Sequence, residues 1–358
     1  MKRLIQTGLV LLLTVLVVVA IRLLAGLPFP DGRLGQGLSA PKRPVIGLLS
    51  WLPLAGAIDP HGRQVTPPWQ VLEEIRQRFQ VELVPGSVEQ VPDEIAVLLL
   101  VHPKGLSEPS LYAIDQFVLR GGKLLLFVDP LSEADTGLGP DLPPDAGRAS
   151  DLEPLLEAWG LRLVPDQVLA DGTYAMGMGL GRGLAPALPE DWLGLPRAAL
   201  DPRDASTQGL AYLSLASAGL LEPLVGASTR FMPVLRSSAN AMPFAATGIA
   251  ALREPLGLSR ELKPTGERYS LAARIRGPAR SAYPEGIEGR REGLKAADSI
   301  HLLVVADTDL LSDPLWVQAQ GLRAETVRQP WADNGRFVIN ALNSLVRSNA
   351  PPAVARLR

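Results

Sequence analysis

Runs of almost purely apolar residues limit most strongly what this chain can fold into. A strand that faces solvent on one side alternates apolar and polar residues, whereas a strand covered on both faces is apolar nearly throughout. Strands of the second kind belong to parallel sheets that carry helices on both sides. The sequence holds such runs at Val45–Trp51, Ile95–Val101, Lys123–Val128 and Ser299–Val305. They predict a mainly parallel α/β sheet.

Helices are expected between these strands. The Pro67–Pro68 pair begins a predicted helix that runs to about Gln80 and carries apolar residues on one face. Ser107 is a suitable N-cap for another helix, which the Gly121–Gly122 pair ends. A strand, a helix and a strand joined by short connections form a right-handed βαβ crossover. The predicted fold class is therefore a doubly wound, mainly parallel α/β sheet.

The expected domains follow from where this alternation of strands and helices holds. The doubly wound domain is predicted to comprise residues 45–165 and 299–348. Residues 166–298 show short apolar stretches between glycines and prolines, with weak helical periodicity, which predicts an inserted β-rich subdomain. Residues 26–44 are expected to form a Gly/Pro linker, and residues 349–358 a C-terminal tail.

The N-terminal segment, residues 1–25, is predicted to be a transmembrane anchor. The uncharged apolar run from Leu4 to Ile21 would span roughly 27 Å as a helix, close to the thickness of a bilayer core. A cleaved signal peptide is the competing interpretation. Its apolar region would be shorter, however, and Arg22 with two following leucines stands where a cleavage site needs small residues.

The orientation of this helix is predicted from the charges beside it. Lys2 and Arg3 favour a cytoplasmic start, although Arg22 and further basic residues on the other flank leave the positive-inside count undecided on its own. Long domains translocate largely regardless of their charge. We therefore expect a single-pass protein of the cytoplasmic (inner) membrane, with its soluble domain extracytoplasmic.

The sequence lacks the residues that several classes of chemistry require. The formal charge is −2, from 35 basic and 37 acidic residues, which argues against a nucleic-acid partner. Cysteine is absent, which excludes thiol catalysis, disulfides and cysteine-based zinc sites. Neither a Gly-x-x-x-x-Gly-Lys-Ser/Thr phosphate-binding loop nor a Gly-x-Ser-x-Gly nucleophile elbow occurs. We expect no cofactor, no metal and no enzymatic activity.

Four polar residues lie just beyond the carboxyl ends of apolar runs: His102, Asp129, Asp307 and Asp309. Doubly wound sheets bind ligands at this edge, so these residues are weak candidates for ligand binding. The three carboxylates together could hold a cation, but turn and capping roles account for them more simply. A structural role is also expected of His102, because no partner base or nucleophile can be named. None of the four is predicted to be catalytic.

One long block of the sequence resembles the soluble domain of GldG-type proteins, which are auxiliary components of ABC-2 transporters first associated with gliding motility. That block is Leu98–Pro130. Further stretches fit the same family in the same order: Leu152–Gly160, Ser270–Gly277, Val304–Asp313 and Asp333–Leu342. The resemblance extends from about Val45 to Ser348.

This resemblance implies a flavodoxin-like or glutamine-amidotransferase-like α/β domain, anchored in the membrane, that works beside an ABC-2 permease and a separate ATPase subunit. It implies no catalytic residues. Relatives commonly end in a second membrane span, whereas the last residues, Val346–Arg358, contain none. We therefore expect either a truncated chain or a single-span variant.

Two functions remain open at the level of sequence. The first is a non-catalytic, membrane-anchored auxiliary subunit whose extracytoplasmic domain docks on the permease or on the cargo. The alternative is an extracytoplasmic carbohydrate-binding or hydrolytic domain on the same scaffold, because a fold does not determine a function.

Overall fold

The structure is a computed structural model that describes residues 43–58, 61, 63–135, 147–176, 190–253, 257–320 and 327–348. The described residues fall in one compact unit, Pro44–Arg358, apart from Arg43. The predicted anchor, nearly all of the predicted linker and the predicted C-terminal tail lie outside the described residues. Among the residues described, no helix combines the length and apolar character needed to cross a membrane.

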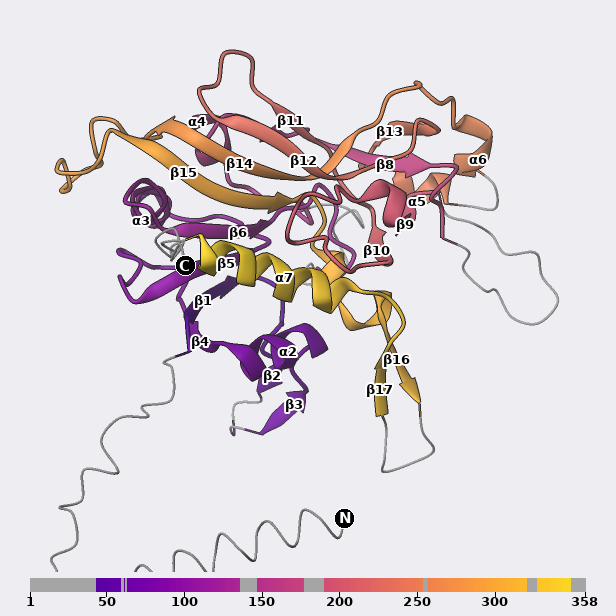
Figure 1. Cartoon of the computed structure of the whole chain (residues 1–358), viewed down its shortest axis with the longest axis horizontal. Helices are drawn as coiled ribbons and strands as arrows, with labels where there is room; N and C mark the ends of the chain where they lie inside the picture. Colours follow the sequence, from indigo (N-terminus) through magenta and orange to yellow (C-terminus); the bar gives the residue numbers. More distant parts are fainter. Residues whose placement is uncertain are drawn as a thin grey trace, which may run out of the picture. The chain divides into compact units, whose positions relative to one another are not determined.

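Five parallel strands form the centre of the main sheet (Figure 1). Across the sheet they are β4 (Gln80–Leu83), β1 (Val45–Ser50), β5 (Ile95–Val101), β6 (Lys123–Phe127) and β15 (Ala296–Val305). Numbered along the chain, this order is 2-1-3-4-5, the order of flavodoxin-like doubly wound sheets. The predicted α/β fold with a mainly parallel central part is confirmed.

Antiparallel strands extend the sheet beyond β15. Strand β14 pairs with β15, while β11 and β12 pair with β14, and β7 pairs with β11. Their bounds are β14 (Ser270–Arg280), β11 (Leu221–Pro223), β12 (Arg230–Arg236) and β7 (Leu161–Leu163). Three of these strands come from residues 166–298, so that segment supplies part of the main sheet. The subdomain boundary within it stays a prediction.

Short two-stranded ribbons complete the β structure. They are β8 (Gln167–Asp171) with β13 (Ala241–Ala245), β9 (Trp192–Pro196) with β10 (Tyr212–Ala216), β16 (Val317–Gln320) with β17 (Val327–Pro330), and β2 (Ala57–Ile58) with β3 (Gln64–Thr66). Two short 3₁₀ turns that follow β15, Asp309–Leu311 and Asp313–Leu315, contact β10.

Helices cover both faces of the parallel strands, which explains why those strands are apolar on both sides. Helices α2 (Gln70–Arg78) and α7 (Asn334–Arg347) pack on one face, in a core with alternate strand residues such as Leu99 and Phe127. Helices α3 (Glu108–Leu119) and α4 (Leu155–Ala158) pack on the other face, with the intervening residues such as Leu100 and Leu126. Two further short helices are α5 (Ile249–Leu252) and α6 (Gly257–Glu261).

Helix α2 begins later than its sequence predicts. The Pro67–Pro68 pair is expected to begin the helix, but the first helical residue is Gln70 and Trp69 is extended. The cause is a distant cap: Oδ1 of Asp313 accepts the Gln70 backbone N–H at 2.7 Å. A carboxylate at this position satisfies one of the unpaired N–H groups of a helix N-terminus.

Candidate functional site

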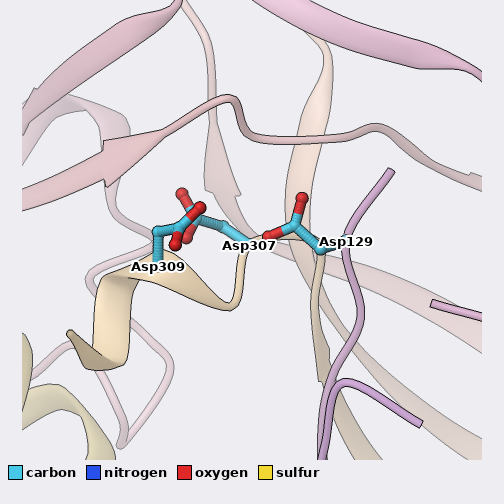
Figure 2. A group of neighbouring side chains, drawn as sticks. All are labelled: Asp129, Asp307 and Asp309. Carbon is cyan, nitrogen blue, oxygen red and sulfur yellow. The ribbon is translucent and has the colours of Figure 1, made fainter. Parts of the chain in front are cut away.

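The carboxyl edge of the sheet brings three predicted residues together (Figure 2). Asp129 follows β6, and Asp307 and Asp309 follow the neighbouring parallel strand β15. One carboxylate oxygen from each lies within 4.8 Å of those of the other two, and all three side chains are buried. Because parallel strands end at a common edge, residues distant in sequence meet there.

Each oxygen of this aspartate cluster already accepts a backbone N–H. For Asp129 the donors are Leu131 and Thr308, at 2.9 and 2.7 Å. For Asp307 they are Leu310 and Ala216, at 2.7 and 2.9 Å. For Asp309 they are Glu133 and Ala134, both at 2.7 Å. The cluster therefore ties the segments that follow β6 and β15 to the last residue of β10, as turn and capping aspartates do.

Burial is the main influence on the pKa values of the three aspartates in the cluster. Burial and the neighbouring charge of Asp309 raise the pKa of Asp129 well above its usual 3.8. Burial, Asp129 and Asp309 do the same to the pKa of Asp307. Burial raises the pKa of Asp309 to about 7, against the lowering effect of its two N–H donors. The three carboxyl groups thus do not ionise at the pH at which exposed aspartates do.

His102 lies beside the cluster in a chain of hydrogen bonds that sequence reasoning missed. Oγ of Ser150 accepts the Asp129 N–H at 3.0 Å, which leaves its hydroxyl hydrogen for Nδ1 of His102 at 2.9 Å. Nε2 of His102 then donates to Asp135 at 3.1 Å. Ser150 and Asp135 border a stretch of sequence rich in Gly, Pro and Asp, where no periodicity predicts which residues meet the sheet edge.

The Ser150–His102–Asp135 chain has the residue types of a catalytic triad, but its histidine is buried. The side chain of His102 is 1% exposed, so its ring cannot reach a substrate. Burial also lowers the pKa of His102, although Asp135 acts to raise it. The backbone N–H of Ser150 donates to the Asp129 carbonyl at 2.7 Å, so main chain and side chain both tie Ser150 to the strand end. The arrangement fastens Ser150 and Asp135 to the edge of the sheet.

An ion-pair network borders the aspartate cluster. It includes Glu133, whose backbone N–H donates to Asp309. Arg253 pairs with both Glu133 and Asp191, and Oγ of Ser217 donates to Glu133 at 2.6 Å. Burial acts to raise the pKa of Glu133, but Arg253, Ser217 and Arg148 together outweigh it and the pKa is lowered. Burial raises the pKa of Asp191, whose Oδ1 accepts no hydrogen bond within the part of the chain that the structure describes. Sequence reasoning missed this network because its members come from separate loops.

A cleft of about 430 Å³ opens at the same edge. The half-buried indoles of Trp69 and Trp192 line it, with the carboxylates of Glu133, Asp309 and Asp313. These carboxylates are engaged: Asp313 accepts the Gln70 N–H and pairs with Arg328, and the other two are bound as described above. The cleft can contact a partner through its apolar wall, but each carboxylate that lines it is already hydrogen-bonded within the protein.

Comparison with solved structures finds only distant similarity. The N-terminal domain of mmIFT52 is 10% identical with a TM-score of 0.41, and the match covers 76% of this chain and 90% of that one. A putative ThuA-like protein from Parabacteroides merdae is 11% identical with a TM-score of 0.38, and the match covers 85% of this chain and 90% of that one. A β-galactosidase from Rahnella sp. R3 is 9% identical with a TM-score of 0.37, over 86% of this chain and 31% of the enzyme. Similarity at this level carries no argument about function.

Comparison of the sequence is more informative. No curated protein matches the chain. A family profile described as "ABC-type uncharacterized transport system" matches residues 43–341, which is most of the chain and nearly all of the described α/β unit. The chain therefore belongs to this family of auxiliary components of ABC-type transport systems.

Proposed function

We propose that the protein is a non-catalytic auxiliary subunit of an ABC-2 type transporter, of the GldG type. In this proposal it contacts the permease or the cargo and carries out no chemistry of its own, while a separate ATPase subunit hydrolyses ATP. Family membership over residues 43–341 supports a role in ABC-type transport. The blocks that resemble GldG-type proteins, Leu98–Pro130 above all, support the finer assignment.

One observation of the site supports binding over catalysis. Catalytic carboxylates need an oxygen that is available to a substrate or a water molecule. At the carboxyl edge, the oxygens of Asp129, Asp307 and Asp309 accept backbone N–H groups, and Glu133 is held by Arg253. Asp191, whose Oδ1 accepts no hydrogen bond from the residues that the structure describes, is fully buried and out of reach of a substrate. This favours the docking subunit over the hydrolytic alternative.

We also propose that residues Leu4–Ile21 anchor the protein in the cytoplasmic membrane and that the α/β domain lies outside the cytoplasm. The length and apolar character of this run support the anchor. Tethering would raise the effective concentration of the domain beside a membrane-embedded permease, which makes a weak docking contact sufficient.

Co-purification from native membranes tests the proposed function. The tagged full chain, solubilised in mild detergent, is expected to carry with it an ABC-2 permease and a separate ATPase. ATP hydrolysis is expected in that mixture and not in the chain purified alone, because the sequence has no phosphate-binding loop. Another tagged single-pass protein of similar abundance serves as the control. Recovery of the chain without either transporter component, while permease and ATPase stay together, would count against the proposal.

A further inference from the structure

A row of basic side chains crosses four adjacent strands of the main sheet. Lys123 of β6 is in register with His301 of β15, His301 with Arg276 of β14, and Arg276 with Arg230 of β12. Residues directly opposite one another on neighbouring strands project from the same face of the sheet. The row begins at the amino end of β6 and crosses β15 at its middle, away from the aspartate cluster at the carboxyl edge.

Like charges directly opposite one another destabilise a sheet, so this row calls for an explanation. His301 relieves it only in part: Nε2 accepts hydrogen bonds from Arg274 at 2.9 Å and Arg276 at 3.0 Å, while Nδ1 contacts Oγ of Ser348 at 3.0 Å. An imidazole that accepts at Nε2 is neutral. Burial, followed by the charges of Arg276, Arg274 and Lys123, lowers the pKa of His301 to about 3. A neutral histidine cannot compensate the arginines.

The arginines of this row line a cavity of about 890 Å³ between β12, β14, α7 and the loop at Asp201. Two arginines that also line it are paired: Arg203 with Asp201 at 3.1 Å and Arg274 with Asp204 at 2.7 Å.

Among the described residues, the other arginines of the cavity are not paired in this way. Within the part of the chain that the structure describes, Arg230, Arg276 and Arg347 have no carboxylate within ion-pair distance. The pKa of Arg276 is lowered, first by burial and then by the charge of Arg274, although the charge of Asp204 acts to raise it. Asn343 and Ser344 of α7 add polar groups to the wall.

We propose that this cavity, the arginine cavity, binds a ligand through a phosphate group. Guanidinium groups pair with phosphate oxygens in bidentate geometry, and converging arginines are the usual means of binding this anion. A bound phosphate, with a charge of about −2, would offset much of the positive charge of Arg230, Arg276 and Arg347 and reduce the repulsion along the row. The volume exceeds that of a bare phosphate and leaves room for the group that carries it, either a soluble metabolite or a lipid headgroup.

The test uses the full chain in detergent micelles and inorganic pyrophosphate as the soluble probe, with the melting temperature as the measurement. Pyrophosphate is expected to raise the melting temperature saturably. Arg276→Gln is expected to require about tenfold more pyrophosphate for the same rise, because it removes a charge-assisted pair. Arg280→Gln, an exposed position on the same strand that does not line the cavity, is the matched control and should behave like the wild type.

The ligand-free variants separate binding from folding. Because Arg276→Gln removes a like charge from the row, its melting temperature without ligand should equal or exceed that of the wild type. Arg230→Gln, at an exposed position, should weaken binding in the same way and serves if Arg276→Gln does not fold.

Mixed micelles with phosphatidic acid, compared with phosphatidylcholine, distinguish the two sources of phosphate. A variant-sensitive rise with phosphatidic acid alone assigns the site to a lipid headgroup, and one with pyrophosphate assigns it to soluble phosphates. No rise with either probe, or an equal rise in Arg276→Gln and the wild type, overturns the proposal.

Discussion

Asp309 shows how burial and hydrogen bonding compete at a single residue. It is 1% exposed, and both of its oxygens accept backbone N–H groups. Hydrogen bonds from N–H groups favour the charged carboxylate, whereas burial favours the neutral acid, and burial prevails. The result is a pKa of about 7 in place of 3.8.

The raised pKa of Asp309 predicts a pH dependence of stability. A carboxyl group whose pKa is raised on folding binds more protons in the native state, so its stabilising effect is complete below pH 3.8 and is lost as the pH rises through about 7. A tenfold change in proton affinity is worth about 1.4 kcal/mol, so the effect amounts to a few kcal/mol. The free energy of unfolding across this range, measured by urea denaturation, should fall more steeply in the wild type than in Asp309→Asn.

The comparison with Asp309→Asn is essential because buried histidines act in the opposite direction. The pKa values of His102 and His301 are lowered on folding, so both contribute stability that is lost as the pH falls below 6.5. The variant keeps both histidines, so the difference between the two profiles reports Asp309 together with its effect on the pKa values of Asp129 and Asp307. Parallel profiles would contradict the raised pKa.

At the residue scale, the sequence predicts which aspartates meet at the sheet edge better than it predicts the side chains that bind them. Asp129, Asp307 and Asp309 could be placed together because each directly follows a strand whose type was evident. Ser150 and Arg253 could not, because their positions depend on the paths of loops, which have no periodicity. The arginine cavity was also missed, since its charged residues come from β12, β14 and α7, which only the fold brings together.

At the scale of elements, α7 contributes fully buried side chains to the core on one face of the sheet. It runs from Asn334 to Arg347 and buries Phe337, Leu342 and Leu345 completely. Its first residue is fixed by side-chain bonds: Asn334 accepts the Ser214 N–H at 3.0 Å and donates to the carbonyls of Ser214 and Leu310.

Truncation of Phe337 tests this role. Phe337→Ala removes a fully buried ring and is expected to lower the free energy of unfolding by about 3–5 kcal/mol, because the loss of transfer energy adds to the cost of a cavity. The control is Arg336→Ala, the adjacent residue, whose exposed side chain pairs with Asp333 and should cost about 1 kcal/mol or less. Similar costs for both variants in chemical denaturation would show that α7 does not support the core.

The elements that could be predicted are those with an uninterrupted apolar pattern in the sequence. Strands β1, β5, β6 and β15 match apolar runs because both of their faces are buried. Strand β14 was not predicted as a strand, since Arg274 and Arg276 interrupt its apolar pattern where one face borders the arginine cavity. Its role in extending the sheet follows from pairing with distant segments, which no local pattern encodes.

At the scale of the whole molecule, the proposed topology predicts where the domain lies. Alkaline phosphatase fused after Arg358 is expected to be active, because the enzyme requires an extracytoplasmic environment, and a cytoplasmic reporter at the same position is expected to be inactive. The same fusions to a chain lacking residues 1–25 serve as controls and should reverse the result. The opposite pattern in the full chain would overturn the orientation, and a mature chain that starts beyond residue 25 would indicate cleavage.

The central claim is that the protein works by contact and not by catalysis, and Ser150→Ala tests it most directly. The hydroxyl group of Ser150 is hydrogen-bonded to His102. The substitution removes only two hydrogen bonds and is expected to lower the free energy of unfolding by about 1–3 kcal/mol. The measurement is complementation of a deletion strain, with the abundance and melting temperature of each variant determined alongside. The account predicts that Ser150→Ala restores most function, whereas a chain without residues 1–25 does not. A folded, normally abundant Ser150→Ala protein that restores no function would contradict the account and favour a hydrolytic triad.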